Sequence, residues 1–246
     1  MTFSIAARCP RTGMLGVATS SKWLAAGAGV PYIKTGVGAI ASQSFANPYL
    51  GIDGLTLLEQ GLTAERALER LIEYDPGRDV RQLAIVDRDG RVAAHTGARC
   101  IPWAGQVMGG GYVCLGNILA GEEVVQAMAR AFEASADEEL PERLLSALEA
   151  GQDAGGDRRG RQSAGLRVVA GEEYPYCDLR VDDHPDPIPE LRRVFQVFQR
   201  EELPYLAMAP RRDDPVPHWD AVMRIRDELA SSLDEQEARL SARKHE

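Results

Sequence analysis

Apolar and polar residues alternate in the first segment of the chain, which is the pattern of a half-buried strand. In "TFSIAAR", residues 2–8, the apolar Phe3 and Ile5 are separated by a serine. The turn-forming "CPRTGM" follows, and "LGVATSS" at 15–21 predicts a second strand that forms a hairpin with the first. The segment "GVGAIASQSF", residues 36–45, predicts a third strand whose small residues permit close packing of the sheet.

The spacing of apolar residues then changes to that of helices. Two helices are predicted within residues 51–79. The apolar residues of the second recur at helical spacing, and they are Ala67, Leu68, Leu71 and Ile72. Thr63 is placed to cap this helix, and the Pro76–Gly77 pair is placed to end it. Residues 81–97, "RQLAIVDRDGRVAAHTG", predict two strands joined by a tight Asp-Gly turn.

The rest of the chain repeats this alternation of strands and helix pairs. Further strands are predicted at 112–119, 163–170 and 176–183, and helices at 122–135, 141–155 and 191–201. This order predicts an α+β fold in which two antiparallel sheets pack face to face and helix pairs cover their outer faces. Residues 1–205 form this domain, and residues 206–246 form a proline-led linker and a charged C-terminal helix. That helix is either an oligomer contact or a solvated extension.

Composition and charge narrow the classes of function. Hydrophobic residues make up 44% of the 246 residues, enough for a sizeable core. A net charge of -9 at pH 7 argues against general binding to nucleic acid or anionic membranes. The sequence shows neither a membrane span nor a signal peptide, so we expect a cytoplasmic protein. The cysteines and histidines are dispersed, so we expect free thiols, no metal and no cofactor.

Position 2 carries the candidate chemistry. A threonine at the start of a chain holds a hydroxyl nucleophile and an α-amino group on one residue, and the amine can take the hydroxyl proton. An α-amine titrates at about 7.7 to 8.0 in model peptides, which suits a general base near neutral pH. The arrangement requires removal of Met1, and Thr2 is small enough for ordinary methionine removal. The alternative is that the strand simply begins there.

The segment "TFSIAARCPRTGMLGVATSSK" resembles the start of N-terminal nucleophile (Ntn) hydrolases, the superfamily of the proteasome β-subunit and several amidases. The chain is more closely similar to a functionally uncharacterised bacterial and archaeal family of that superfamily. The similarity covers about residues 1–200, through "MTFSIAAR", "LGVATSSKWLA", "PGRDVRQLAIVD", "CIPWAGQVMGGG", "GNILAG", "GGDRRGRQSAGLRVV" and "DLRVDDHPDPIPELRR". It implies a four-layer αββα fold, hydrolysis of an amide bond and, by analogy with ring-forming relatives, a homo-oligomer.

The same resemblance suggests roles for individual residues. Thr2 is the nucleophile, and its amine is the base. The basic residue beside it is Lys22, at the end of the second strand, or Lys34, before the third, and Lys22 is preferred. Asn47 and Asn117, near strand ends, are candidate donors to an oxyanion. Each of these four has a structural alternative, as a solvated surface lysine or a turn-forming asparagine.

An arginine cluster supplies candidate contacts to the substrate. Arg158, Arg159 and Arg161 lie among glycines in "AGGDRRGRQSAG", and guanidinium groups bind carboxylates bidentately. The functional interpretation is a pocket for an anionic acyl or peptide-like substrate. The structural interpretation is a loop whose arginines pair with neighbouring carboxylates.

Two hypotheses of function follow. The leading one is an N-terminal-threonine hydrolase that cleaves a peptide-like or acyl-amide bond of a small substrate, which is anionic if the arginine cluster binds it. The alternative is a catalytically inactive protein that binds an anionic metabolite on the same fold. The segment "GRDVRQ", residues 77–82, is expected to form a buried polar network with a structural role.

Overall fold

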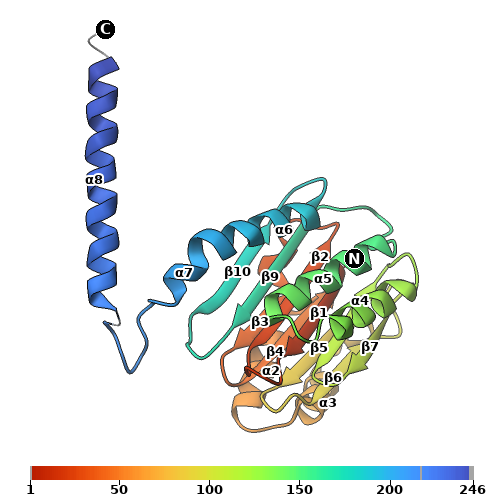
Figure 1. The fold of residues 1–246 in the computed structure, drawn as a ribbon. Coiled ribbons are helices and arrows are strands. Elements are labelled where there is room, and N and C mark those ends of the chain that lie inside the picture. The colour runs from red at the N-terminus through yellow and green to blue at the C-terminus, as the bar shows by residue number, and fades with distance from the viewer. Residues whose placement is uncertain (1, 217, 244–246) are drawn as a thin grey trace. The chain divides into compact units, whose positions relative to one another are not determined.

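The computed structural model describes residues 2–216 and 218–243, with side chains described through residue 232 (Figure 1). The chain divides into two compact units, Met1–Gln196 and Val197–Glu246. This division lies at the end of helix α6, Pro187–Val197, and the domain boundary expected after residue 205 stays a prediction.

The first unit contains a six-stranded antiparallel sheet with the strand order β10-β9-β2-β1-β8-β7. Its strands are β1 Thr2–Arg8, β2 Leu15–Ser21, β7 Gly105–Gly109, β8 Tyr112–Asn117, β9 Ser163–Val169 and β10 Pro175–Val181. β1 lies between β2 and β8, so its backbone is hydrogen-bonded on both sides. The predicted hairpin of β1 and β2 is confirmed. β7 was not predicted, because its sequence "GQVMG" shows no regular alternation.

A four-stranded antiparallel sheet has the order β3-β4-β5-β6. Its strands are β3 Pro31–Lys34, β4 Gly38–Ser44, β5 Arg81–Asp87 and β6 Val92–Thr96. The predicted Asp-Gly hairpin is confirmed by β5 and β6, and the predicted third strand is confirmed as β4. β3 was not predicted, because a segment of four residues is too short to show a period.

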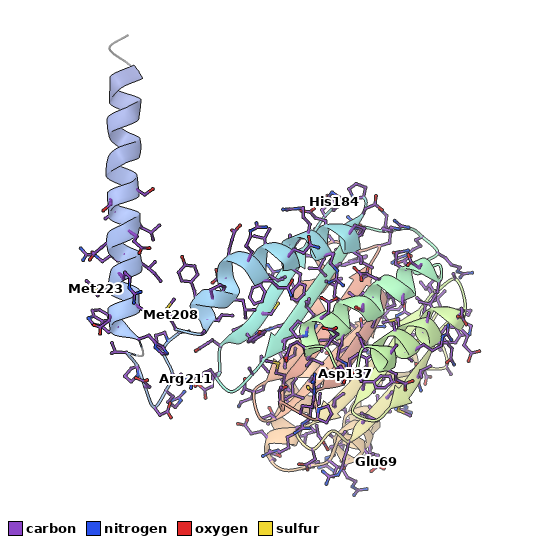
Figure 2. All side chains as sticks on the ribbon, in the orientation of Figure 1. Glu69, Asp137, His184, Met208, Arg211 and Met223 are labelled. Atoms are coloured by element: carbon purple, nitrogen blue, oxygen red, sulfur yellow. The ribbon has the colours of Figure 1, made fainter. Side chains whose placement is uncertain are left out.

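Helices cover parts of both sheets. They are α1 Ala26–Gly29, α2 Pro48–Glu59, α3 Ala64–Tyr74, α4 Glu123–Ala134 and α5 Leu140–Asp153, with the 3-10 turn η1 Arg78–Val80. α2 and α3 contact the four-stranded sheet, and α4 and α5 contact the six-stranded sheet. The sheets contact each other through β1 and β8 on one side and β4 and β5 on the other. Figure 2 shows the side chains that these elements carry. The predicted cap is confirmed, because the Thr63 side chain accepts a hydrogen bond from the Arg66 N–H.

The space between the sheets changes from apolar to polar along the strands. Alternate side chains of a strand share a face, so Ala6 of β1 lies on the same face as Ser4 and Thr2. Ala6 belongs to an apolar cluster that draws residues from both sheets, among them Val17, Ala39, Ala84, Val113 and Leu115. Ser4 instead forms a hydrogen bond to Gln43 of the other sheet. The polar end of the interior is therefore the end at which β1 begins.

The second unit contains the π-helical segment η2 Phe198–Glu202, α7 Leu203–Leu206 and α8 Trp219–Arg243. The predicted C-terminal helix is confirmed by α8. Among the described residues, no helix combines the length and the apolar character needed to cross a membrane.

A partly buried ion pair, Asp75–Arg81, links the end of α3 to the start of β5 and to the loop after β4. Asp75 accepts hydrogen bonds from Arg81 Nε at 2.8 Å and from the Gly77 N–H at 3.0 Å. Arg81 also donates to the backbone oxygen of Phe45. Burial alone would raise the pKa of the Asp75 carboxyl, but the Arg81 and Gly77 donors outweigh it and hold this pKa below its ordinary value. The pair therefore stabilises the fold only while Asp75 is ionised.

We predict that Asp75→Asn lowers the free energy of unfolding at pH 7 by about 2 kcal/mol, because Arg81 loses its charged partner. A carboxyl with a lowered pKa stabilises the fold above its unfolded pKa of about 4 and loses this contribution as the pH falls toward the folded value. The difference between wild type and variant should therefore shrink between pH 5 and pH 3 in urea denaturation. Glu69→Gln, in the exposed pair with Arg66, is the control and should change stability by less than about 0.5 kcal/mol. Equal losses in both variants would contradict the structural role of Asp75.

Candidate functional site

Thr2 lies at the polar end of the space between the two sheets and is enclosed by the neighbouring strands. In the sheet register it stands directly opposite Ser21 of β2 on one side and Asn117 of β8 on the other. The Thr2 Oγ1 lies 3.1 Å from the Ser21 Oγ, and Thr2 as a whole is 7% exposed. A hydroxyl on an internal strand with a hydrogen-bond partner occupies one defined position, as a positioned nucleophile must.

A layer of neutral polar side chains lies directly beneath Thr2. The Ser4 Oγ lies 2.8 Å from the Thr19 Oγ1 and 2.6 Å from the Gln43 Oε1. Gln43 reaches across from β4, and its Nε2 donates to the backbone oxygen of Thr2 at 3.2 Å. The first residue of β1 is therefore held by a side chain of the opposite sheet.

Gln82 of β5 connects this layer to β8. Its Oε1 accepts hydrogen bonds from the Gln43 Nε2 at 2.8 Å and from the Asn117 Nδ2 at 2.9 Å. Its Nε2 lies 2.7 Å from the Gly116 oxygen, 2.9 Å from the Thr96 Oγ1 and 3.2 Å from the Gly105 oxygen. Backbone carbonyls can only accept, so they fix which end of the Gln82 amide faces them. The opposite end, the carbonyl oxygen, must then face Gln43 and Asn117.

The arginine-containing loop after α5 lies against the strand ends beside Thr2. Asp157 is buried in this loop, and its Oδ2 accepts a hydrogen bond from the Lys22 backbone N–H at 2.8 Å. The Gln162 N–H donates to the Ser21 oxygen at 3.1 Å, and the Arg158 N–H donates to the Ile118 oxygen at 3.3 Å. The loop thus contacts Ser21 and Lys22 on one side of Thr2, and on the other side it contacts Ile118, which follows Asn117.

The structure separates the two candidate lysines. Lys22 directly follows Ser21, and its side chain is exposed at the end of the sheet where Thr2 lies. Lys34 pairs in register with Gly38, five residues along β4 from Gln43, which corresponds to about 17 Å of strand. Its ammonium is 2.5 Å from the carboxylate of Glu59. Lys22 is therefore brought to the Thr2 end, and Lys34 is placed away from it.

The two candidate asparagines also differ in placement. Asn117 is opposite Thr2, and its amide nitrogen is held by Gln82. Asn47 is the N-cap of α2, where its Oδ1 accepts a hydrogen bond from the Tyr49 N–H at 3.1 Å. Asn117 thus lies beside Thr2, whereas the Asn47 side chain caps α2.

Each candidate arginine has a partner within the protein. Arg158 donates to the backbone oxygen of Pro102 at 2.6 Å. The guanidinium of Arg159 lies 3.4 Å from the carboxylate of Asp157, and Arg161 forms an ion pair with Asp186. The structural interpretation of this loop, arginines paired with groups nearby, accounts for these contacts without an anionic ligand.

Sequence reasoning missed Ser21, Gln43 and Asp157 as parts of the site. The available signal was the row of polar residues at inward positions of predicted strands, where apolar residues are usual. The prediction that residues 77–82 contribute to a buried polar network is confirmed for Arg81 and Gln82. What the sequence could not give was the convergence of Gln43, Gln82 and Asn117, because these residues lie on three separate strands.

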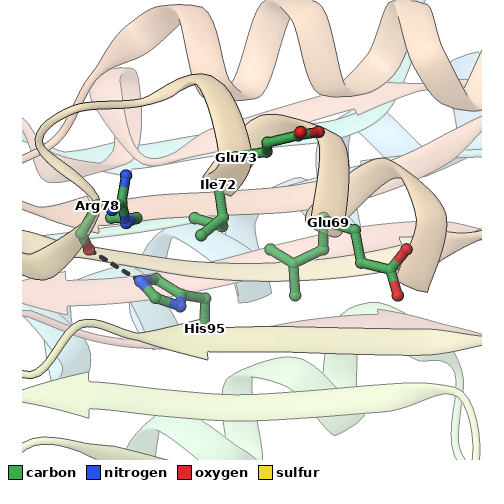
Figure 3. Close-up of a pocket in the computed structure, with 6 residues that line it drawn as sticks. Glu69, Ile72, Glu73, Arg78 and His95 are labelled. Atoms are coloured by element: carbon green, nitrogen blue, oxygen red, sulfur yellow. Dashed lines mark hydrogen bonds between the residues drawn. The ribbon is translucent and has the colours of Figure 1, made fainter.

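A groove of about 600 Å³ lies elsewhere, between α3 and β6 (Figure 3). It is lined by Leu68, Glu69, Ile72, Glu73, Arg78 and His95. A ring nitrogen of His95 is hydrogen-bonded to the Arg78 backbone oxygen at 2.8 Å. His95 precedes Thr96, which faces Gln82, so the two side chains lie on opposite faces of the sheet. The groove is therefore separate from the Thr2 layer. Among the side chains that the structure describes, residues 2–216 and 218–232, no group of three or more His, Cys, Asp or Glu is arranged to hold a metal ion.

The chain is similar to one protein family and to several solved structures. The profile of a family of unknown function, DUF1028, matches residues 2–191. The crystal structure of protein SPO2555 from Silicibacter pomeroyi, assigned to DUF1028, has a TM-score of 0.80 and 34% sequence identity over 87% of this chain and 97% of that chain. Anbu (ancestral beta-subunit) from Yersinia bercovieri has a TM-score of 0.38 and 12% identity over 85% of this chain and 98% of that chain. No curated protein matches the chain.

We predict that Gln82→Glu destabilises the protein by about 2 to 4 kcal/mol at pH 7, because a carboxylate would face two backbone carbonyls that cannot donate. Protonation restores a donor, so the pKa of the introduced carboxyl is raised in the folded state. A raised pKa favours the fold below the unfolded value of about 4.3 and loses this contribution as the pH rises. The stability difference from wild type should therefore grow from pH 4 to pH 7 in chemical denaturation. Gln60→Glu, at an exposed position, should show no such trend, and a flat profile for Gln82→Glu would contradict the network.

Proposed function

Since this chain belongs to DUF1028, a family of unknown function, we propose its activity from the geometry at Thr2: it is an N-terminal-threonine hydrolase that cleaves an amide bond of a small substrate. The observation that carries the proposal is the Thr2 hydroxyl, held by Ser21 on an internal strand above a satisfied polar layer. Under this proposal the fold is a four-layer αββα sandwich of the Ntn type. The contacts of α2 and α3 with one sheet and of α4 and α5 with the other support it.

The reaction requires that the peptide bond before Thr2 is cleaved, which frees the α-amine. The amine then takes the proton of the Thr2 hydroxyl as its oxygen bonds to the carbonyl carbon of the substrate. The tetrahedral intermediate collapses when the protonated amine returns this proton to the leaving amine, and the carbon–nitrogen bond breaks. Water, activated by the same amine, hydrolyses the resulting ester and regenerates the hydroxyl. No step in this scheme needs a metal or a cofactor.

Asn117 and Lys22 support the charge changes of this reaction. The Asn117 Nδ2 carries two N–H groups; one is bonded to Gln82, and the other can donate to the oxyanion of an acyl group at Thr2. Lys22 adds positive charge at the same end of the sandwich, which favours the neutral form of the neighbouring amine. Gln43 acts on the backbone of Thr2 and fixes its orientation.

The alternative from the sequence, an inactive protein that binds an anionic metabolite, stays a prediction. Arg158, Arg159 and Arg161 each have a partner in the protein, so no specific contact favours it. Its signature would be a rise in melting temperature with carboxylated metabolites that is the same in wild type and in Thr2→Ala. Location in the cytoplasm and assembly into a homo-oligomer are predictions of the same standing.

We predict that wild-type protein reacts at residue 2 with a β-lactone, which acylates an activated hydroxyl, and that Thr2→Ala shows no such adduct. Thr2→Ser should keep slower labelling, because serine supplies the same amine and hydroxyl with one methyl group less. Intact mass gives the state of the N-terminus, and peptide mapping gives the site of the adduct. The melting temperature of the variants should stay within a few degrees of wild type.

Thr56→Ala, which removes an exposed threonine hydroxyl on α2, is the matched control and should label as wild type does. Protein that labels fully at residue 2 while its amine is still capped by methionine would contradict the amine-base mechanism. Labelling that persists in Thr2→Ala would contradict Thr2 as the nucleophile.

A further inference from the structure

Large apolar side chains are exposed at the end of the sandwich that holds Thr2. We call four of them the apolar rim: Trp23, Leu24, Phe45 and Ile101, which are 68%, 59%, 61% and 44% exposed. Clusters of exposed apolar side chains on a soluble protein commonly mark a binding surface, whereas scattered single ones do not. Whether these side chains form a binding surface for a substrate therefore depends on how close they lie to Thr2.

The rim residues lie close to the three residues around Thr2, which are Ser21, Gln43 and Asn117. Trp23 is two residues after Ser21, and Phe45 is two residues after Gln43. The Ile101 backbone oxygen accepts a hydrogen bond from the Ile118 N–H at 2.9 Å, and Ile118 directly follows Asn117. Each member thus lies within a few residues, or one hydrogen bond, of the Thr2 environment.

Side chains of the core hold the rim backbone in place. The Ser163 Oγ donates to the Trp23 oxygen at 2.6 Å, and Arg81, itself paired with Asp75, donates to the Phe45 oxygen. A preorganised surface loses less conformational freedom when a ligand covers it. Two independent anchors thus keep these apolar positions next to the nucleophile.

The groups between the rim and the core are uncharged. In the described part of the chain, Ser4, Gln43, Gln82 and Asn117 form side-chain hydrogen bonds only to neutral groups. The nearby arginines bind Pro102, Asp157 and Asp186. Desolvating a charged substituent against these neutral side chains would be unfavourable, because none of them supplies an opposite charge. Lys22 and Arg158, the cations at this end, are both exposed to solvent, and Arg158 is bonded to a backbone oxygen.

We infer that the site recognises a large, uncharged apolar side chain, aliphatic or aromatic, on the acyl side of the scissile amide. The acyl carbonyl sits at Thr2, and the apolar substituent lies on the rim of Trp23, Leu24, Phe45 and Ile101. This inference rests on the proposed function, and it replaces an anionic substrate with a neutral one.

The test compares two peptide epoxyketones that differ only in the side chain beside the ketone, leucine in one and glutamate in the other. Such a probe reacts with a hydroxyl and an amine of the same residue. With full-length protein whose N-terminus has been verified by mass, the leucine probe should label residue 2 at least about tenfold faster, since removing a well-packed apolar contact costs this order of selectivity. A β-lactone with a small substituent measures nucleophile reactivity without the rim.

In Trp23→Ala and Phe45→Ala, the ratio of leucine-probe to β-lactone labelling should fall about tenfold. Tyr174→Ala removes an exposed aromatic side chain in the turn at the far end of β9 and should leave the ratio unchanged. The β-lactone distinguishes the reactivity of Thr2 from the specificity of the rim. If it labels nothing, the proposed hydrolase fails and this inference fails with it.

Three results with a reactive Thr2 would overturn the apolar specificity alone. Equal rates with both epoxyketones would show that the side chain is not recognised. Faster labelling by the glutamate probe, lost in Arg158→Ala, would assign recognition to the arginine loop. Unchanged probe ratios together with dissociation of an oligomer in Trp23→Ala, seen by sedimentation, would show that a second copy covers the rim.

Discussion

The orientation of one buried amide, that of Gln82, governs the arrangement around Thr2. The backbone oxygens of Gly116 and Gly105 can only accept hydrogen bonds, so the Gln82 nitrogen must face them. Its oxygen is then the acceptor for Gln43 and Asn117. Because an unsatisfied buried polar group costs about 1 to 3 kcal/mol, reversing this one amide would leave several groups unpaired at once. The network therefore has one favourable arrangement.

This network joins the two sheets where their apolar contact ends. Further along the strands, the contact between the sheets is made by small and branched apolar side chains such as Ala39, Val86 and Leu115. Their burial stabilises the fold, but it is not directional. Hydrogen bonds are directional, so the polar layer fixes the position of β1 relative to β4 of the other sheet, which the apolar core alone does not. The position of Thr2 is therefore fixed twice, by the pairing of β1 with β2 and β8 and by the hydrogen bond from Gln43 of the other sheet.

Charged side chains near Thr2 serve mainly to attach loops to strand ends. Asp157 holds the backbone of Lys22, and the Asp75–Arg81 pair reaches the backbone of Phe45. The interior layer itself is neutral, and its side chains form hydrogen bonds to one another and to backbone carbonyls. Because these charged side chains bond to the backbone of loops, a protein with a net charge of -9 can present an apolar rim beside its candidate nucleophile.

The sequence by itself determined the elements whose signals are local. The hairpin of β1 and β2, the Asp-Gly hairpin and the Thr63 cap depend on alternation, turn residues and spacing within a few positions. Only the tertiary structure decided which polar residues meet. Gln43 and Gln82 are separated by 39 positions and Asn117 and Gln82 by 35, and their contact depends on strand order and register, which no local pattern encodes. The hairpin of β1 and β2 already places Lys22 at the Thr2 end, because Ser21 pairs with Thr2. The opposite position of Lys34 was decided only by the tertiary structure, since it depends on β4 lying across from β1 with Gln43, and not Gly38, at Thr2.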